Sequence, residues 1–123
     1  MGLDTKSRVW NRAALESGGD NPGEGDQALA ALLLAHSLIM NGGVEHALEV
    51  LSPQEVEAAV AGFRYFSLNA VGDLLKMSLE GCPEDVDLRY GKLIPEDGII
   101  IGRFEAIFLQ SPEAFTPLRD RAD

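Results

Sequence analysis

The sequence has very little cysteine and no apolar run long enough to form a membrane helix. Cys82 is the single cysteine among 123 residues, so no disulfide can form within the chain, which mildly favours a reducing compartment. The longest apolar stretch, residues 28–40, includes His36 and Ser37 and is shorter than the roughly 20 residues that span a membrane. The opening residues MGLDTKSRVW lack the apolar core of a signal peptide. We therefore expect a soluble, cytoplasmic protein.

Positive charge is also scarce, because 10 Lys and Arg residues stand against 20 Asp and Glu residues, for a net charge of −10. The imbalance is concentrated between Glu24 and Asp87, where eleven acidic residues are opposed only by Arg64 and Lys76. Such a field repels nucleic acid and anionic membranes and attracts basic surfaces. Two interpretations follow: a surface that binds a basic partner, or a solvated acidic face that only keeps the protein soluble.

The motifs of common catalytic and phosphate-binding sites are missing. No lysine follows Gly43, and the residues before it have the pattern of a helix and not of a strand, so the double glycine is not a phosphate loop. No Gly-x-Ser-x-Gly sequence occurs, and the acidic residues near Cys82 are expected to raise the pKa of its thiol and make it unreactive. We therefore expect a protein that is not an enzyme and has no cofactor.

The two histidines allow a weaker alternative. His36, Glu45, His46 and Glu49 are possible metal ligands, yet neither His-x-x-x-His nor Glu-x-x-His is present. The simpler interpretation places His36 at the edge of a core helix with one hydrogen bond and His46 on the surface. A small-ligand or metal site in the His36 and His46 region stays open as the alternative, although the spacing predicts no metal.

What the sequence does contain is a series of short segments with helical apolar spacing, separated by turn residues. We predict one all-α domain, residues 1–123, that forms a compact bundle of about six short helices. The last region is ambiguous, because a small β-hairpin near residues 93–101 competes with a helix from about Asp97 to Leu109. The expected helices are those around residues 9–14, about 26–40, from 44, from 53 through Phe63, from 71 to 79, and about 97–109.

Two local motifs define boundaries in this series. Asn41, Gly42 and Gly43 follow the central helix, and glycine reaches the left-handed conformation that a helix end commonly requires. The second glycine lets the chain turn sharply into the next helix. Ser52 and Glu55 flank a proline in a capping-box pattern, which predicts a helix start at residue 53.

The surface is the remaining candidate for function. Glu45 and Glu49 are one helical turn apart, and Glu55 and Glu57 follow on the next helix. Carboxylates on rigid helices can be spaced by several ångströms, as phosphates are along a nucleic-acid strand. We predict that these four residues contact a basic protein, such as a DNA-binding regulator, and that residues 41–43 shape the corner that presents them. An immunity protein against a toxin nuclease would have the same composition, and a homodimer is compatible with it.

Several short motifs also resemble a known family. Trp10, the Asn-Gly-Gly motif at 41–43, the two-helix stretch from Phe63 to Leu75, and SPEAF at 111–115 resemble the bacterial DNA-mimic protein family, whose members are mostly of unknown function. Val44 replaces an expected aromatic residue, and Ala47-Leu48 stand where larger aromatics would come. The resemblance implies an all-helical fold and an acidic surface that occupies a DNA-binding regulator.

Overall fold

The computed structural model describes residues 5–118, and this part of the chain is built from helices without a strand. The all-α prediction is therefore confirmed, with seven α-helices where about six were expected; residues 1–4 and 119–123 of the predicted domain lie outside the described residues. The helices are α1 (Thr5–Glu16), α2 (Glu24–Gly42), α3 (Val44–Val50), α4 (Pro53–Tyr65), α5 (Asn69–Ser78), α6 (Val86–Leu93) and α7 (Asp97–Gln110), followed by the short 3₁₀ helix η1 (Pro112–Ala114).

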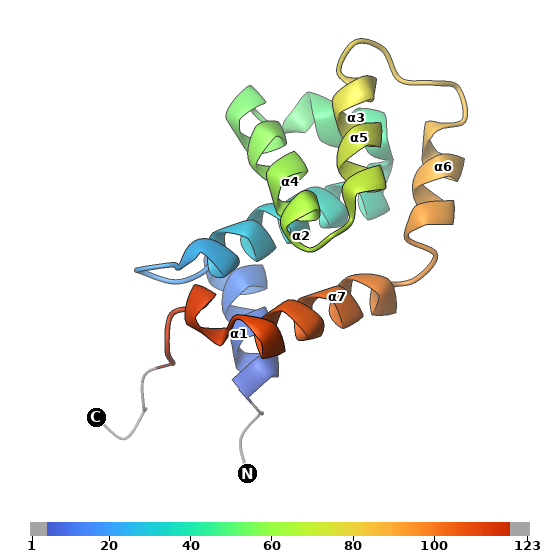
Figure 1. Ribbon diagram of the computed structural model, residues 1–123. Helices are drawn as coiled ribbons and strands as arrows, with labels where there is room; N and C mark the ends of the chain where they lie inside the picture. Colours follow the sequence, from blue (N-terminus) through green and yellow to red (C-terminus); the bar gives the residue numbers. More distant parts are fainter. Residues whose placement is uncertain (1–4, 119–123) are drawn as a thin grey trace.

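Helix α2 is the centre of the fold. In Figure 1, helices α3 to α6 gather on one side of α2, and α1 and α7 cross on the other. Helix α2 packs most extensively against α4 and also contacts α1 and α3. Leu29 and Leu32 on α2 are completely buried, as the nearly continuous apolar sequence of this segment predicts.

The packing of α4 on α2 depends on a glycine. Gly62 is buried on α4, and a Cβ atom at this position would lie 2.5 Å from the carbonyl oxygen of Ala28 on α2. Because that oxygen belongs to helical backbone, it cannot rotate away as a side chain could. The close approach of the two helices therefore requires the missing side chain.

The corner between α2 and α3 is made by one glycine of the predicted motif. Asn41 and Gly42 are still helical, so α2 ends later than expected, and only Gly43 leaves the helix, with φ of +95°. The Gly43 N–H donates to the carbonyl of Ile39 at 2.7 Å, which closes α2. On the far side of the corner, the Val44 N–H donates to the Asp87 carboxylate of α6 at 2.8 Å. Asp87 thus caps α3 from a distant segment.

The start of α4 follows the predicted capping box. The Ser52 Oγ accepts from the Glu55 N–H at 3.1 Å, and the Glu55 carboxylate accepts from the Ser52 N–H at 2.9 Å. Pro53 occupies the first helical position, where no N–H is needed. Two free donors of the first turn are thereby satisfied.

Replacing Ser52 by alanine should lower the free energy of unfolding by about 1 kcal/mol, because the Glu55 N–H loses its acceptor. Urea denaturation followed by far-UV circular dichroism measures the change. Gln54→Ala is the matched control, since Gln54 is exposed in the same turn and Ala is at least as good a helix former. An equal loss in both variants would show that the Ser52 side chain does not cap α4.

The β-hairpin alternative for residues 93–101 was wrong. This stretch contains the last residue of α6, a short connection through Pro95, and the first turn of α7. Ile100 and Phe104 are both buried at a spacing of four residues, so the helical pattern of the following sequence decides the conformation. Helix α6 itself was not predicted, because it buries only Val86 and Tyr90.

Aromatic rings join the two ends of the described chain. Phe104 of α7 is completely enclosed and contacts rings from α1, from the turn after α4, and from the residues after η1. The predicted return of Phe115 to the core is confirmed, with 3% of its surface exposed. Its ring contacts Phe104 and Phe108, and Phe104 in turn contacts Trp10 and Phe66. Among the described helices, none has both the length and the apolar character needed to cross a membrane.

Candidate functional site

Three carboxylates of α3 and α6 act electrostatically on the thiol of Cys82, which lies in the connection between α5 and α6. Burial raises the pKa of the Cys82 thiol most, and the negative charge of Glu45 raises it further. Asp87 and Glu49 add to the same pKa shift, so both also lie close enough to act on the thiol. We call Glu45, Glu49 and Asp87 the acidic surface. The predicted pair on α3 is therefore joined by a residue of α6 that was not among the four predicted contact residues.

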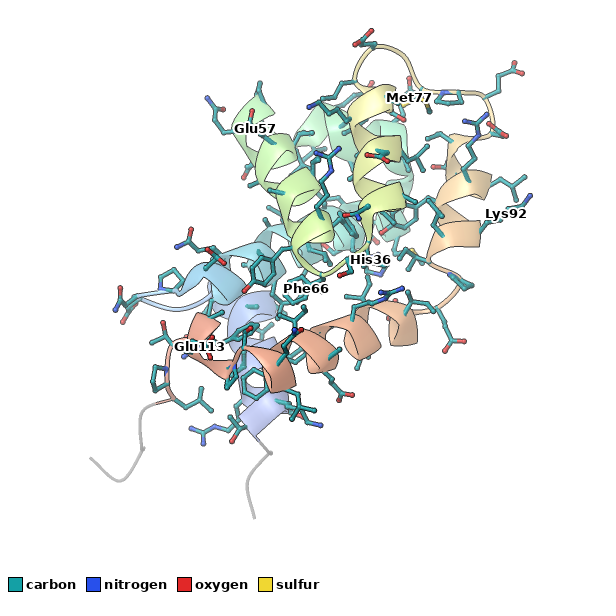
Figure 2. All side chains as sticks on the ribbon, viewed as in Figure 1. His36, Glu57, Phe66, Met77, Lys92 and Glu113 are labelled. Carbon is teal, nitrogen blue, oxygen red and sulfur yellow. The ribbon has the colours of Figure 1, made fainter. Side chains whose placement is uncertain are left out.

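The other two predicted contact residues lie on α4 and differ in role. Glu55 is exposed, but its carboxylate is engaged in the capping box at Ser52. Glu57 is exposed near the outer end of α4 (Figure 2) and lines a groove together with Arg64 and Lys76. The four glutamates thus occupy exposed positions on α3 and α4, and only Glu45 and Glu49 act on the same neighbouring group.

None of the ion pairs within residues 5–118 involves a carboxylate of the acidic surface. Within residues 5–118, the ion pairs of this half of the molecule join Arg64 to Asp73 and Arg89 to Asp85, each at 2.9 Å. No Lys or Arg in that range lies within 4 Å of a Glu45 or Glu49 carboxylate oxygen. The field of the acidic surface therefore extends into solvent.

Apolar side chains are exposed on the same elements. Val50, beside Glu49 at the end of α3, is 55% exposed, and Leu79, after α5, is also 55% exposed. Leu88 on α6, adjacent to Asp87, is 61% exposed. Apolar groups set among charges are typical of surfaces that contact other proteins, although single exposed residues are common.

His36 is fully engaged inside the fold. Its Nδ1 lies 2.7 Å from the Tyr90 hydroxyl and its Nε2 lies 2.9 Å from the Asp97 carboxylate. A neutral ring satisfies both contacts if the Tyr90 hydroxyl donates to Nδ1 and the Nε2–H donates to Asp97. Burial, aided by the negative charge of Asp97, raises the pKa of Tyr90, so the hydroxyl keeps its proton. The expectation of a single hydrogen bond was wrong, and His36 links α2 to both α6 and α7.

The two histidines do not form a joint site in the described chain. His46 is exposed on α3, and its ring lies over Gly42, where a Cβ atom would be 2.5 Å from the ring. Among residues 5–118, no group of three or more His, Cys, Asp and Glu side chains is arranged to hold a metal ion. The ring nitrogens of His36 are already occupied, so it has no lone pair to offer without breaking a contact.

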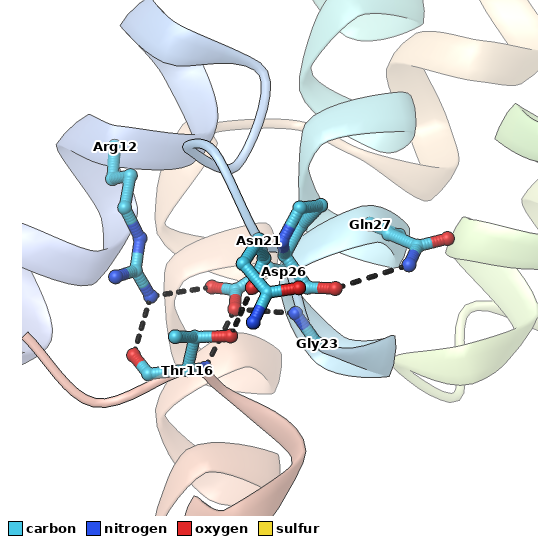
Figure 3. Close-up of polar contacts among 7 residues, drawn as sticks. Arg12, Asn21, Gly23, Asp26, Gln27 and Thr116 are labelled. Carbon is cyan, nitrogen blue, oxygen red and sulfur yellow. Dashed lines mark hydrogen bonds and ion pairs between the residues drawn. The ribbon is translucent and has the colours of Figure 1, made fainter.

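A buried ion pair that the sequence did not reveal ties the early helices to the late residues (Figure 3). Asp26 is completely buried, and its Oδ1 accepts from Arg12 Nη2 at 2.9 Å. Its Oδ2 accepts from the backbone N–H of Gly23 at 3.0 Å and of Thr116 at 2.7 Å. Arg12 also donates to the Thr116 carbonyl at 2.7 Å. Both carboxylate oxygens of Asp26 therefore accept hydrogen bonds from other groups of the protein, which indicates a structural role.

Two apolar grooves lie elsewhere on the described part of the chain. One has a volume of 440 Å³ and lies between α1, α2 and the start of α7, beside His36 and Trp10. The other has a volume of 450 Å³ and lies between α3, α4 and α5. Both volumes fall in the range of small-molecule sites. Only the second is lined by basic side chains, Arg64 and Lys76, and the acidic side chain of Glu57 lines it as well.

Comparison with known proteins finds no match, whether with protein-family models, with curated proteins or with solved structures. The function is therefore inferred from the acidic surface and the grooves themselves.

Proposed function

We propose that the protein is a cytoplasmic, non-enzymatic module that binds a basic protein through the acidic surface. The observation that carries this proposal is that Glu45 and Glu49 are exposed on α3, whose first turn is held by Asp87, and that no Lys or Arg of residues 5–118 pairs with the two glutamates. Unbalanced charge of one sign steers an oppositely charged partner and speeds association. The exposed Val50 and Leu88, next in sequence to Glu49 and Asp87, supply apolar area for the contact itself.

The local geometry supports a rigid presentation of these charges. Gly43 turns the chain out of α2, and Asp87 fixes the first turn of α3 by accepting from the Val44 N–H. The corner at Gly43 therefore sets the direction of α3. Because a preorganised surface loses little conformational entropy on binding, its charges contribute more of their interaction energy to affinity.

The partner we favour is a basic DNA-binding regulator. Glu45 and Glu49 lie one turn apart on α3, so their carboxylates are separated by several ångströms, as neighbouring phosphates are. The protein would then occupy the regulator's DNA-binding surface by mimicking nucleic acid. This is also what the resemblance to the DNA-mimic family implies.

Neutralising the pair Glu45→Gln and Glu49→Gln should weaken binding to such a partner by roughly tenfold or more, since each close charge contact contributes about 1 kcal/mol or above. The tagged protein captures partners from a bacterial lysate at low salt, and the purified captured protein is then titrated with the wild type and the variants. Glu16→Gln with Glu113→Gln is the matched control, because both residues are exposed and carry the same charge.

The proposal requires three results together: weaker capture at high salt, loss of affinity only in the α3 variant, and displacement of DNA from the captured protein. Salt-insensitive binding, equal losses in both variants, or absence of a basic partner would contradict it. A captured nuclease whose activity is inhibited would favour the immunity-protein alternative.

A further inference from the structure

The end of α2 contains the only Asn-Gly pair of the sequence, Asn41 and Gly42. Asn41 is exposed, and Gly42 is the last residue of the helix. Because glycine has no side chain to shield its backbone nitrogen, that nitrogen can approach the side-chain carbonyl carbon of the asparagine before it. The other three asparagines precede Arg12, Pro22 and Ala70. Asn41 is therefore the asparagine whose following residue hinders such an attack least.

The last turn of α2 is exposed and ends at a sharp change of backbone direction. Met40, Asn41 and Gly42 are all exposed. Gly43 leaves the helix with φ of +95°, so no further turn continues beyond it. In a helix the Gly42 N–H is committed to a backbone hydrogen bond, but exposed helix ends open locally at a much smaller free-energy cost than buried helices. The Gly42 nitrogen is therefore released whenever this turn opens.

An imidazole ring lies against Gly42 from the first turn of α3. A Cβ atom at Gly42 would lie 2.5 Å from the Cδ2 atom of His46 and 2.7 Å from its Cγ atom. Only a residue without a side chain lets the ring lie this close. Imidazole accepts and returns protons near neutral pH, which suits it to general acid–base catalysis. The structure thus places a proton acceptor against the residue that supplies the attacking nitrogen.

We propose that Asn41 is a site of spontaneous deamidation, assisted by His46. When the last turn of α2 opens, the Gly42 nitrogen bonds to the side-chain carbonyl carbon of Asn41 and forms a cyclic succinimide. His46 accepts the proton of the Gly42 nitrogen and returns it to the side-chain amide nitrogen of Asn41, which leaves as ammonia. Water then opens the ring at either carbonyl and gives aspartate or isoaspartate. This chemistry needs no protein partner, so it is independent of the proposed function.

The products change the corner that joins α2 to α3. Isoaspartate carries the chain through its side-chain carbon, so the backbone gains one atom and the last turn of α2 loses its helical hydrogen-bond spacing. Both products also add a negative charge at the C-terminal end of α2, where the helix dipole is already negative. The modified protein should therefore unfold at a lower urea concentration than the unmodified protein.

The full chain is incubated at physiological temperature and neutral pH, and the conversion of each asparagine is followed by peptide mass spectrometry. We expect Asn41 to deamidate over days, no more than about tenfold more slowly than in the urea-unfolded chain, because only a helix end must open. Asn11, Asn21 and Asn69 should stay intact over the same period and serve as internal controls. A rate at Asn41 roughly a thousandfold below that of the unfolded chain, as for a residue held in the core, would overturn the proposal.

Two substitutions separate the parts of the reaction. His46→Gln removes the proton acceptor and should slow deamidation by about threefold or more in the folded protein, with no effect in urea, where the ring is no longer held against Gly42. Arg103→Gln is the matched control, because Arg103 is an exposed basic residue on α7, on the other side of α2 (Figure 1). Gly42→Ala should slow deamidation about tenfold in both states, since the added methyl group hinders the attack.

The variants also define the results that reject the proposal. An unchanged rate in Gly42→Ala, or faster deamidation at another asparagine, would reject Asn41 as the site. Equal rates in His46→Gln and Arg103→Gln, or an equal effect of His46→Gln in folded and unfolded chains, would reject the assistance by His46. Thermal unfolding of each variant confirms that it is folded before the incubation.

Discussion

Replacing Asp26 by asparagine should lower the free energy of unfolding by about 3–5 kcal/mol, since it leaves the buried charge of Arg12 without a counter-ion. The Asp26 carboxylate accepts from Arg12 and from the backbone N–H groups of Gly23 and Thr116. An asparagine offers one acceptor oxygen and turns an NH₂ group toward the remaining donors, so at least one of them loses its partner. Urea denaturation followed by far-UV circular dichroism measures the loss.

The same substitution at an exposed ion pair is the control. Asp73 pairs with Arg64 at the same distance of 2.9 Å, but its side chain is 71% exposed, so Asp73→Asn should leave the urea midpoint nearly unchanged. A mild effect of Asp26→Asn, similar to that of Asp73→Asn, would mean that the Asp26 network does not hold the fold together.

Replacing Gly62 by alanine should cost about 2–3 kcal/mol of unfolding free energy, although alanine is the better helix former. The added methyl group would lie 2.5 Å from the carbonyl oxygen of Ala28, so α4 must move away from α2. These two helices form the most extensive contact of the fold, and a shift there opens space around Leu32 and Phe63. The urea midpoint and the thermal midpoint should both fall.

Gly91→Ala tests the same chemical change where there is room. Gly91 is exposed on α6, and a Cβ atom there would meet nothing within 4 Å. Alanine should therefore stabilise the protein by about 0.5–1 kcal/mol through helix propensity alone. The two glycine variants are expected to change stability in opposite directions. A stabilising effect at both positions would show that α2 and α4 are not in close contact at Gly62.

The helical fold was largely predictable because its signals are local. The spacing of Val56, Val60 and Phe63 predicted α4, and the capping box fixed its first residue. A glycine with positive φ was expected after α2, and Gly43 fills that position. Such patterns depend on residues within one or two turns of each other, so the sequence displays them directly.

Contacts between distant segments could not be predicted in the same way. Asp26 looked like an ordinary acidic residue at a helix start, and its partners lie 14 and 90 positions away. His36 appeared to need one partner, because neither Tyr90 nor Asp97 is near it in sequence. Helix α6 was missed since it has a short apolar stripe and a central Gly91. Only the folded chain brings these residues together.

The candidate site was predictable in part for the same reason. Glu45 and Glu49 were recognisable as one helix face, and both are exposed. The addition of Asp87 depends on the corner at Gly43, which brings the first turn of α3 against α6. The lowered reactivity of Cys82 was expected from acidic neighbours, whereas burial proved to be the larger cause of its raised pKa.

The clasp formed by Arg12, Asp26 and Thr116 also constrains how the chain is made. During synthesis, Asp26 emerges from the ribosome 90 residues before Thr116. Until Thr116 is made, the Asp26 carboxylate lacks the hydrogen bond from the Thr116 N–H. Phe115, whose ring packs against Phe104, is also synthesised at this late stage. Nascent chains shorter than about 116 residues should therefore remain loosely packed and sensitive to protease, and the compact state should form only after translation of that segment.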